Sequence, residues 1–233
     1  MNPLERFENP EIKGRIPHSM LGKIVERMKY VNKGVRRTEV AANLKYPPFY
    51  IEPFLPLAAT KFELGKYGAL YARTIPSLTT SGVKILVQIS APLVALGLPG
   101  TIHAVIAHEF LHYLDFVRRF SRMDSLAQEV PTSLFESSYA DADHIFPSHM
   151  VFKDKALVRL LEKKFHAGFV DNRLNKKTEE QWIGKGLPTM TVALETNTTR
   201  IPISVLMKST FDPMVTMKIE DLEKITIGRA QKG

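Results

Sequence analysis

The sequence predicts an α+β fold, in which helices pack on a small twisted sheet, and three observations lead to this prediction. Apolar residues recur at helical spacing in residues 18–31 and again in residues 154–166. The run GVKILVQIS, residues 82–90, carries branched apolar residues at every second position, as a half-buried strand does. Residues 98–120 are largely apolar, which is typical of a buried helix. A chain of 233 residues is long enough to bury such a core.

The N-terminal part is predicted to contribute a helical layer and the sheet. Residues 18–31 form one amphipathic helix, and RRTEVAANL, residues 36–44, forms a second, shorter helix with Thr38 as its cap. The four prolines of residues 45–57 favour extended or looping chain. Residues 66–74 are β-like, and the run GVKILVQIS follows them.

Two helices are predicted in the middle of the chain. Thr101 is the expected N-cap of the first, and residues 131–146 form the second, which ends at Pro147. Residues 85–107 contain no Asp, Glu, Lys or Arg and are long enough to span a bilayer. The prolines and glycines inside this segment instead favour a strand, a turn and a buried helix, so we expect no membrane span.

The C-terminal part is predicted to be a mixture of helix and strand. Residues 154–166 form an amphipathic helix, residues 189–207 form a hairpin around a TNTT turn, and residues 219–225 form a last short helix. We therefore divide the chain into a core with a helical N-terminal layer, residues 1–150, and an α/β extension, residues 151–233, packed on that core.

Composition limits the class of protein. The net charge of +8 attracts acidic partners, such as nucleic acid, anionic lipid or acidic peptides, without distinguishing between them. Cysteine is absent, so no disulfide forms and any zinc must be held by His, Asp or Glu. The first residues lack the apolar run of a secretory signal, and we expect a cytoplasmic protein.

The segment AVIAHEFLHYLDF, residues 104–116, carries the residues with the clearest chemistry. His108 and His112 are four residues apart, so on a helix their imidazoles lie on one face and can bind one zinc ion. Glu109 lies one step around the helix, where a carboxylate can take a proton from a water on the metal. Three ionisable side chains in so apolar a helix are costly to bury unless they bind something.

These residues resemble a known family. VIAHEFLHYL, residues 105–114, is similar to the extended HExxH pattern of the zincin metallopeptidases, including the valine three residues before the first histidine. The resemblance implies a zincin-like core, with His108 and His112 as zinc ligands and Glu109 as the general base that activates the water. It also implies that an edge strand before the helix, here KILVQIS, binds a peptide or protein substrate as an added strand.

The sequence offers more than one candidate for the third zinc ligand. Metzincins carry a glycine and a third histidine where this chain has Asp115 and Arg118. In gluzincins a glutamate on a following helix completes the site, and Glu136 is the corresponding candidate. The stretch around Glu136 also resembles, more weakly, the ImmA/IrrE group of regulatory zinc peptidases. Thermolysin-like enzymes have an aspartate four residues after this glutamate, whereas here Asp141 lies five after it.

Several alternatives remain around this ligand. Ser133 and Glu136 also fit a capping box, which would make Glu136 a helix-start residue. His144 and then Asp141 are the next candidates for the third ligand. His144 or Tyr139 could instead stabilise the oxyanion of the reaction.

Asp115 allows two interpretations. It lies three residues after His112, where it could accept the ring N–H of a zinc ligand and fix the tautomer of that ring. It could also face solvent and pair with Arg118 or Arg119.

The leading functional hypothesis is a zinc-dependent metallopeptidase, and two others compete with it. Residues 20–46 have the character of a basic helix–turn–helix module that binds nucleic acid, although the prolines after residue 46 would interrupt its reading helix. A zincin fold retained for binding, with little hydrolysis, is the other alternative.

Overall fold

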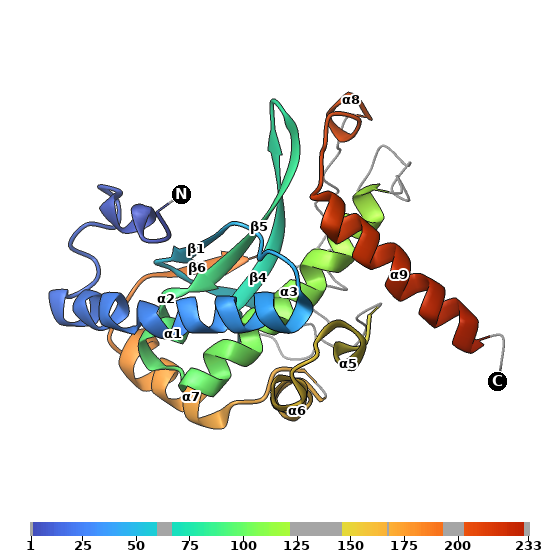
Figure 1. Ribbon diagram of the computed structural model, residues 1–233. Coiled ribbons are helices and arrows are strands. Elements are labelled where there is room, and N and C mark those ends of the chain that lie inside the picture. Colours follow the sequence, from blue (N-terminus) through green and yellow to red (C-terminus); the bar gives the residue numbers. More distant parts are fainter. Residues whose placement is uncertain (1, 60–66, 122–145, 167, 193–202, 231–233) are drawn as a thin grey trace.

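The computed structural model describes residues 2–59, 67–121, 146–166, 168–192 and 203–230 (Figure 1). Helices and two small sheets make up this part of the chain, which is α+β as the sequence predicts. The elements in chain order are η1 (Glu5–Glu8), α1 (His18–Ala42), β1 (Phe49–Glu52), β2 (Leu55–Ala59), β3 (Tyr67–Ala69), β4 (Ala72–Thr79), β5 (Gly82–Ser90), α2 (Ala91–Leu96), α3 (Pro99–Ser121), α5 (Ser148–Val151), α6 (Lys155–Lys164), α7 (Asn172–Thr178), η2 (Glu179–Ile183), β6 (Thr189–Val192), α8 (Ile203–Leu206) and α9 (Pro213–Ala230).

The first sheet has the strand order β1-β5-β4, with β5 in its centre. β1 runs parallel to β5, and β4 runs antiparallel to it with Thr74 opposite Val87. The prediction that KILVQIS forms an edge strand is therefore wrong, because β5 has a hydrogen-bonded neighbour on each side. β4 is an edge of this sheet among the described strands, and the β4–β5 hairpin projects beyond the helices around it (Figure 1).

The second sheet has the strand order β3-β2-β6, and its strand β6 comes from the C-terminal part of the chain. β6 pairs parallel with β2. The predicted hairpin over residues 189–207 is wrong in its second arm, because Ile203–Leu206 is helix α8; residues 193–202 lie outside the described residues. The domain boundary between residues 150 and 151 stays a prediction, and the pairing of β6 with β2 crosses it.

α1 is one continuous helix where the sequence predicts two. Gly34 lies where α1 crosses α3, and a Cβ at this position would lie 2.8 Å from Ile106 Cδ1 and 2.9 Å from His103 Cδ2. The glycine therefore permits a close helix crossing and does not end the helix. Thr38, the predicted cap, is buried inside α1 and donates to the carbonyl oxygen of Gly34 at 2.9 Å. The helix–turn–helix arrangement proposed for residues 20–46 is wrong on this evidence.

α3 confirms the helix predicted over residues 98–120 and forms the centre of the molecule. It begins at Pro99, so the prediction of Thr101 as N-cap is wrong, and the Thr101 hydroxyl donates to Asp171 Oδ2 at 2.6 Å. One half of α3 packs with β5 and α2, and the other half packs with α6 and α9. Among the described helices, none is long and apolar enough to cross a membrane.

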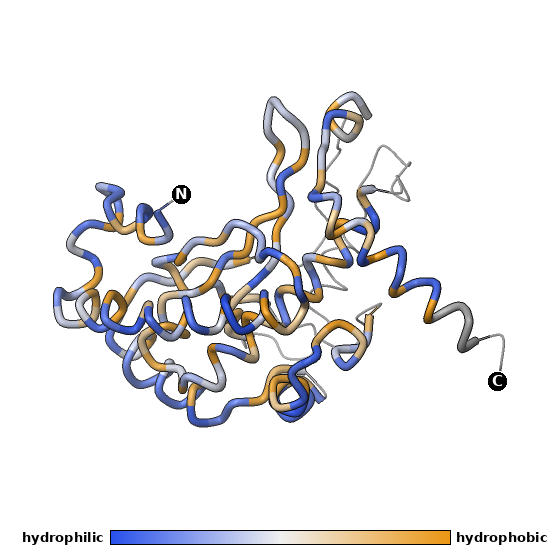
Figure 2. Tube along the Cα trace, viewed as in Figure 1, coloured by the Kyte–Doolittle hydropathy of each residue, from blue (hydrophilic) through white to orange (hydrophobic). Residues whose placement is uncertain are grey.

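The described helices α6 and α9 lie where helices were predicted from the sequence, but their lengths differ from the predicted ones. α6 begins after Asp154, whose side chain accepts the backbone N–H groups of Ala156 and Leu157. α9 contains the short helix predicted over residues 219–225 but begins earlier, at Pro213. Figure 2 shows hydrophobic residues interspersed with hydrophilic ones along α1 and the coloured part of α9. The buried residues include Ile24 and Val31 of α1 and Val215 and Ile219 of α9, so each helix packs one side on the core. The helix predicted over residues 131–146 falls almost entirely outside the described residues.

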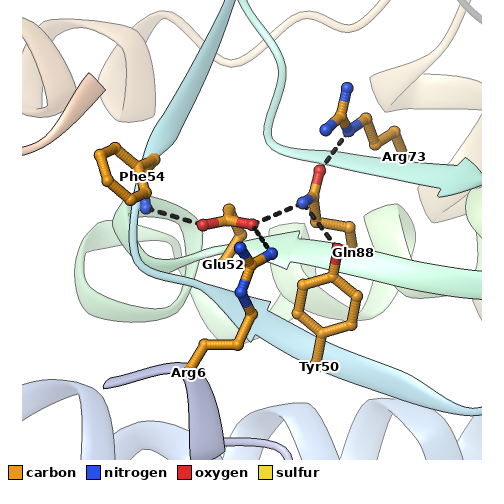
Figure 3. Close-up of polar contacts among 6 residues, drawn as sticks. All are labelled: Arg6, Tyr50, Glu52, Phe54, Arg73 and Gln88. Atoms are coloured by element: carbon orange, nitrogen blue, oxygen red, sulfur yellow. Dashed lines mark hydrogen bonds and ion pairs between the residues drawn. The ribbon is translucent and has the colours of Figure 1, made fainter. Parts of the chain in front are cut away.

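Figure 3 shows a buried polar cluster, which we name the Glu52 network. It occupies the sheet face opposite α3, because Gln88 lies one residue from Val87, which pairs with Thr74 on the α3 side. Glu52 is fully buried and pairs with Arg6, which comes from the N-terminal segment. The Gln88 side chain donates to Glu52 Oε2 at 2.6 Å, and the backbone N–H of Phe54 donates to Oε1 at 3.3 Å. Both carboxylate oxygens thus have a donor. The members of the Glu52 network are Arg6, Tyr50, Glu52, Phe54, Arg73 and Gln88.

Candidate metal centre

The HExxH residues lie in the buried middle of α3. The exposed fraction is 3% for His108, 4% for Glu109 and 5% for His112, so water reaches none of them freely. Apolar residues before and after them carry α3 through the core, which explains why three ionisable groups are held inside the protein.

The two imidazoles converge, as the four-residue spacing predicts. His108 Nε2 lies 3.1 Å from His112 Nε2, and the ring planes are nearly perpendicular, at 89°. Tetrahedral zinc with Zn–N bonds of about 2.0–2.1 Å places two ligating nitrogens about 3.3 Å apart. The observed distance therefore suits two ligands of one cation. It also suits a direct Nε2–H···Nε2 hydrogen bond, which is the alternative without metal.

Thr74 of β4 holds the carboxylate of Glu109. The Thr74 hydroxyl is buried and lies 2.8 Å from Glu109 Oε2 and 3.0 Å from the Glu109 carbonyl oxygen. Its single proton can be donated to either oxygen, so the hydroxyl links either the side chain or the backbone of Glu109 to the edge strand. This contact sets the direction of the carboxylate relative to β4.

Tyr46 lies close enough to respond to the charge of Glu109. Burial, and to a smaller extent the Glu109 carboxylate, raise the pKa of Tyr46 well above its ordinary value. The phenol therefore stays protonated at neutral pH, and its O–H donates to the carbonyl oxygen of Ile106 at 2.9 Å. Tyr46 thus supports the α3 backbone just before the two histidines.

Phe165, just after α6, covers one face of the His108 ring. The two rings are parallel within 8°, and their centroids are 3.7 Å apart. Phe165 also contacts Phe169, whose ring lies 5.4 Å from that of Tyr71. A series of aromatic rings therefore runs from His108 to the start of β4. Phe165, which stacks on His108, restricts rotation of the imidazole.

Asp115 is buried, with 9% of its surface exposed, so its interpretation as a solvent-facing residue is wrong. Its role as an acceptor for a ligand ring stays a prediction. Arg118, one of the suggested partners of Asp115, forms an ion pair with Glu223 of α9, with 3.7 Å between Arg118 Nε and Glu223 Oε1.

The remaining predicted site residues lie outside the described residues. These are Glu136, Tyr139, Asp141 and His144, together with Ser133 of the proposed capping box. Within the residues that the structure does describe, no group of three or more His, Cys, Asp or Glu is gathered for a metal ion. The structure therefore brings His108 and His112 together and places the Glu109 carboxylate against Thr74, while the third ligand stays a prediction.

Thr74 and Phe165 also belong to this site, and neither was predicted from the sequence. Thr74 is one of many β-branched residues in a strand, and only the pairing of β4 with β5 brings it to Glu109. Phe165 ends an amphipathic helix and is indistinguishable there from an ordinary core residue. Neither position carries a local sequence signal of its contact.

Comparison with known proteins gives no family for the chain. No family model matches it, and no match was found among curated proteins or solved structures. The chemistry of the site must therefore be inferred from its own residues.

Proposed function

We propose that the chain is a zinc-dependent peptidase with a zincin-type centre, and that His108 and His112 hold the metal. The observation that carries this proposal is the 3.1 Å approach of their Nε2 atoms inside a buried helix. Here Glu109 is held by Thr74, as a proton carrier must be held.

The chemistry divides between the metal and the protein. Zinc in such a site supplies a Lewis acid that polarises a peptide carbonyl and makes water more acidic. Glu109 accepts the proton of the attacking water and delivers it to the nitrogen of the leaving amine. Phe165 keeps the His108 ring facing His112. We propose Glu136 as the third ligand, with His144 and Asp141 as alternatives.

The substrate would bind along β4. The sequence had instead predicted binding along KILVQIS, which is β5. β4 lies beside α3, is an edge among the described strands, and bears the hydroxyl that holds Glu109. Its Pro76 is also typical of an edge strand, since proline lacks the N–H that a central strand donates. An extended peptide added to β4 would therefore pass the Glu109 carboxylate.

The test compares two isosteric substitutions of buried glutamates in the zinc-loaded protein, using a quenched fluorescent peptide library. Glu109→Gln should retain zinc and lower hydrolysis by about 10²- to 10⁴-fold, because the amide cannot accept a proton. Glu52→Gln, the matched control on the other sheet face, should cleave at the wild-type rate. Equal hydrolysis by wild-type and Glu109→Gln protein would contradict the proposal.

A further inference from the structure

The C-terminal half of α1 presents a basic stripe on the side opposite α3. Lys33, Arg36, Arg37 and Val40 recur at spacings of three and four residues, so they share one face of the helix. Gly34 and the buried residues of α1 face α3 on the other side. In Figure 1 the C-terminal end of α1 lies between α6 and the beginning of α9.

Two hollows open on this stripe, one on either side of Arg36 and Val40. The first has a volume of about 490 Å³ and lies against Lys153 and Asp154, next to α6. The second has a volume of about 370 Å³ and reaches Leu44 and Met214, next to α9. Because they share lining residues, the two hollows form one surface, which we name the α1 groove.

The first hollow has an excess of positive charge. Arg37 is paired with Asp154 at 2.7 Å, and this hydrogen bond is the main cause that lowers the pKa of Asp154 below its ordinary value. Among the described residues no ion pair engages Lys33, Arg36 or Lys153, all of which are exposed. Three cations thus face one hollow whose single carboxylate is already neutralised.

The positive potential reaches the helix behind the groove. His103 of α3 lies against Gly34 of α1. Burial lowers the pKa of His103, and the charges of Arg37 and Lys33 lower it further. The groove therefore favours an anionic occupant.

Apolar side chains decide which class of anion fits. Val40 is 72% exposed and Met214 is 56% exposed, and both line the groove beside the cations. The carboxylates of the second hollow already accept backbone N–H groups, Glu39 from Tyr46 and Asp212 from Met214. A nucleic acid backbone offers phosphates but no aliphatic side chains to cover Val40 and Met214, whereas a peptide can offer both.

We propose that the α1 groove binds an acidic peptide segment of a partner protein. The carboxylates of the peptide pair with Lys33, Arg36 and Lys153, and an apolar side chain of the same peptide packs on Val40 and Met214. The site is separate from the metal centre, because α1 lies between the groove and α3. The inference stands whether or not the chain is a peptidase.

Fluorescence anisotropy tests this with a labelled dodecapeptide of repeated Glu-Glu-Leu. The double variant Lys33→Glu/Lys153→Glu should bind about tenfold more weakly, since two exposed attractions become repulsions. The matched control is Lys13→Glu/Lys163→Glu, which changes net charge equally at exposed lysines outside the groove. It should change affinity by less than about threefold. Equal loss in both double variants, or no binding by the wild-type chain, would overturn the proposal.

Two further probes separate a peptide site from a general polyanion site. Val40→Ser/Met214→Ser should lower the affinity for the peptide several-fold without changing the salt dependence of binding, because it removes only apolar contact. A labelled single-stranded DNA dodecamer should bind more weakly than the peptide and be insensitive to Val40→Ser/Met214→Ser. Tighter binding of the DNA, or an unchanged peptide affinity in Val40→Ser/Met214→Ser, would contradict a peptide occupant.

Discussion

The Glu52 network and the HExxH cluster both bury a glutamate against the β1-β5-β4 sheet, but on opposite faces. Around Glu52, a guanidinium, an amide and a backbone N–H all point toward the carboxylate. In the HExxH cluster, the imidazole nitrogens of His108 and His112 point toward each other, and the Thr74 hydroxyl donates to the carboxylate of Glu109. A buried charge surrounded by donors needs no ligand. Two imidazole nitrogens at this distance suit a shared cation, and under the proposed function this difference distinguishes a structural glutamate from a catalytic one.

The largest effect expected on stability comes from the first region. Glu52→Gln keeps the shape of the side chain but removes the charge that Arg6 and Gln88 address, so the free energy of unfolding should fall by about 2–3 kcal/mol. Glu109→Gln in the zinc-free protein should change it by less than about 1 kcal/mol, since Thr74 can donate to an amide oxygen as well. Denaturant unfolding of both variants measures the difference. A larger loss for Glu109→Gln would remove the distinction between the two regions.

The next effect concerns how Glu109 is held. Thr74→Val preserves the branched shape in β4 but removes the hydroxyl, so peptide hydrolysis should fall by about 10- to 100-fold while zinc affinity stays unchanged. Thr74→Ser keeps the donor and should retain most of the activity. If valine and serine variants hydrolyse peptides equally well, the hydroxyl does not orient the carboxylate.

The smallest effect concerns the ring that covers His108. Phe165→Leu should weaken zinc binding by about threefold to tenfold, because an aromatic contact of this kind contributes about 0.5–1.5 kcal/mol. Phe169→Leu changes the next ring in the series and should leave zinc affinity unaltered. Competition with a chelator measures both affinities, and the visible spectrum of the cobalt-substituted protein reports any change at the ligands. Identical affinities and spectra for the two variants would show that Phe165 has no positioning role.

Sequence patterns predicted those parts of the molecule that depend on neighbours along one helix. The convergence of His108 and His112 follows from helical spacing alone, and the largely apolar sequence around them predicted that α3 is buried. The position of α6 was predicted correctly for the same reason, because its apolar residues recur at helical spacing.

Features that depend on distant residues were not predicted. Gly34 resembles a helix break, but its lack of a side chain serves the crossing with α3, far along the chain. The central place of β5 and the pairing of β6 with β2 depend on strand partners that no local pattern names. Burial of β5 on both faces, with Gln88 and Ser90 as covered as Ile89, is the physical sign of a central strand.

The central claim is that His108 and His112 bind one zinc ion, and anomalous diffraction at the zinc edge tests it most directly. Crystals grown with zinc should show a single peak about 2.1 Å from Nε2 of each ring, and His112→Ala should abolish it. No peak between the rings at saturating zinc, with the two Nε2 atoms joined by a direct hydrogen bond, would contradict the account.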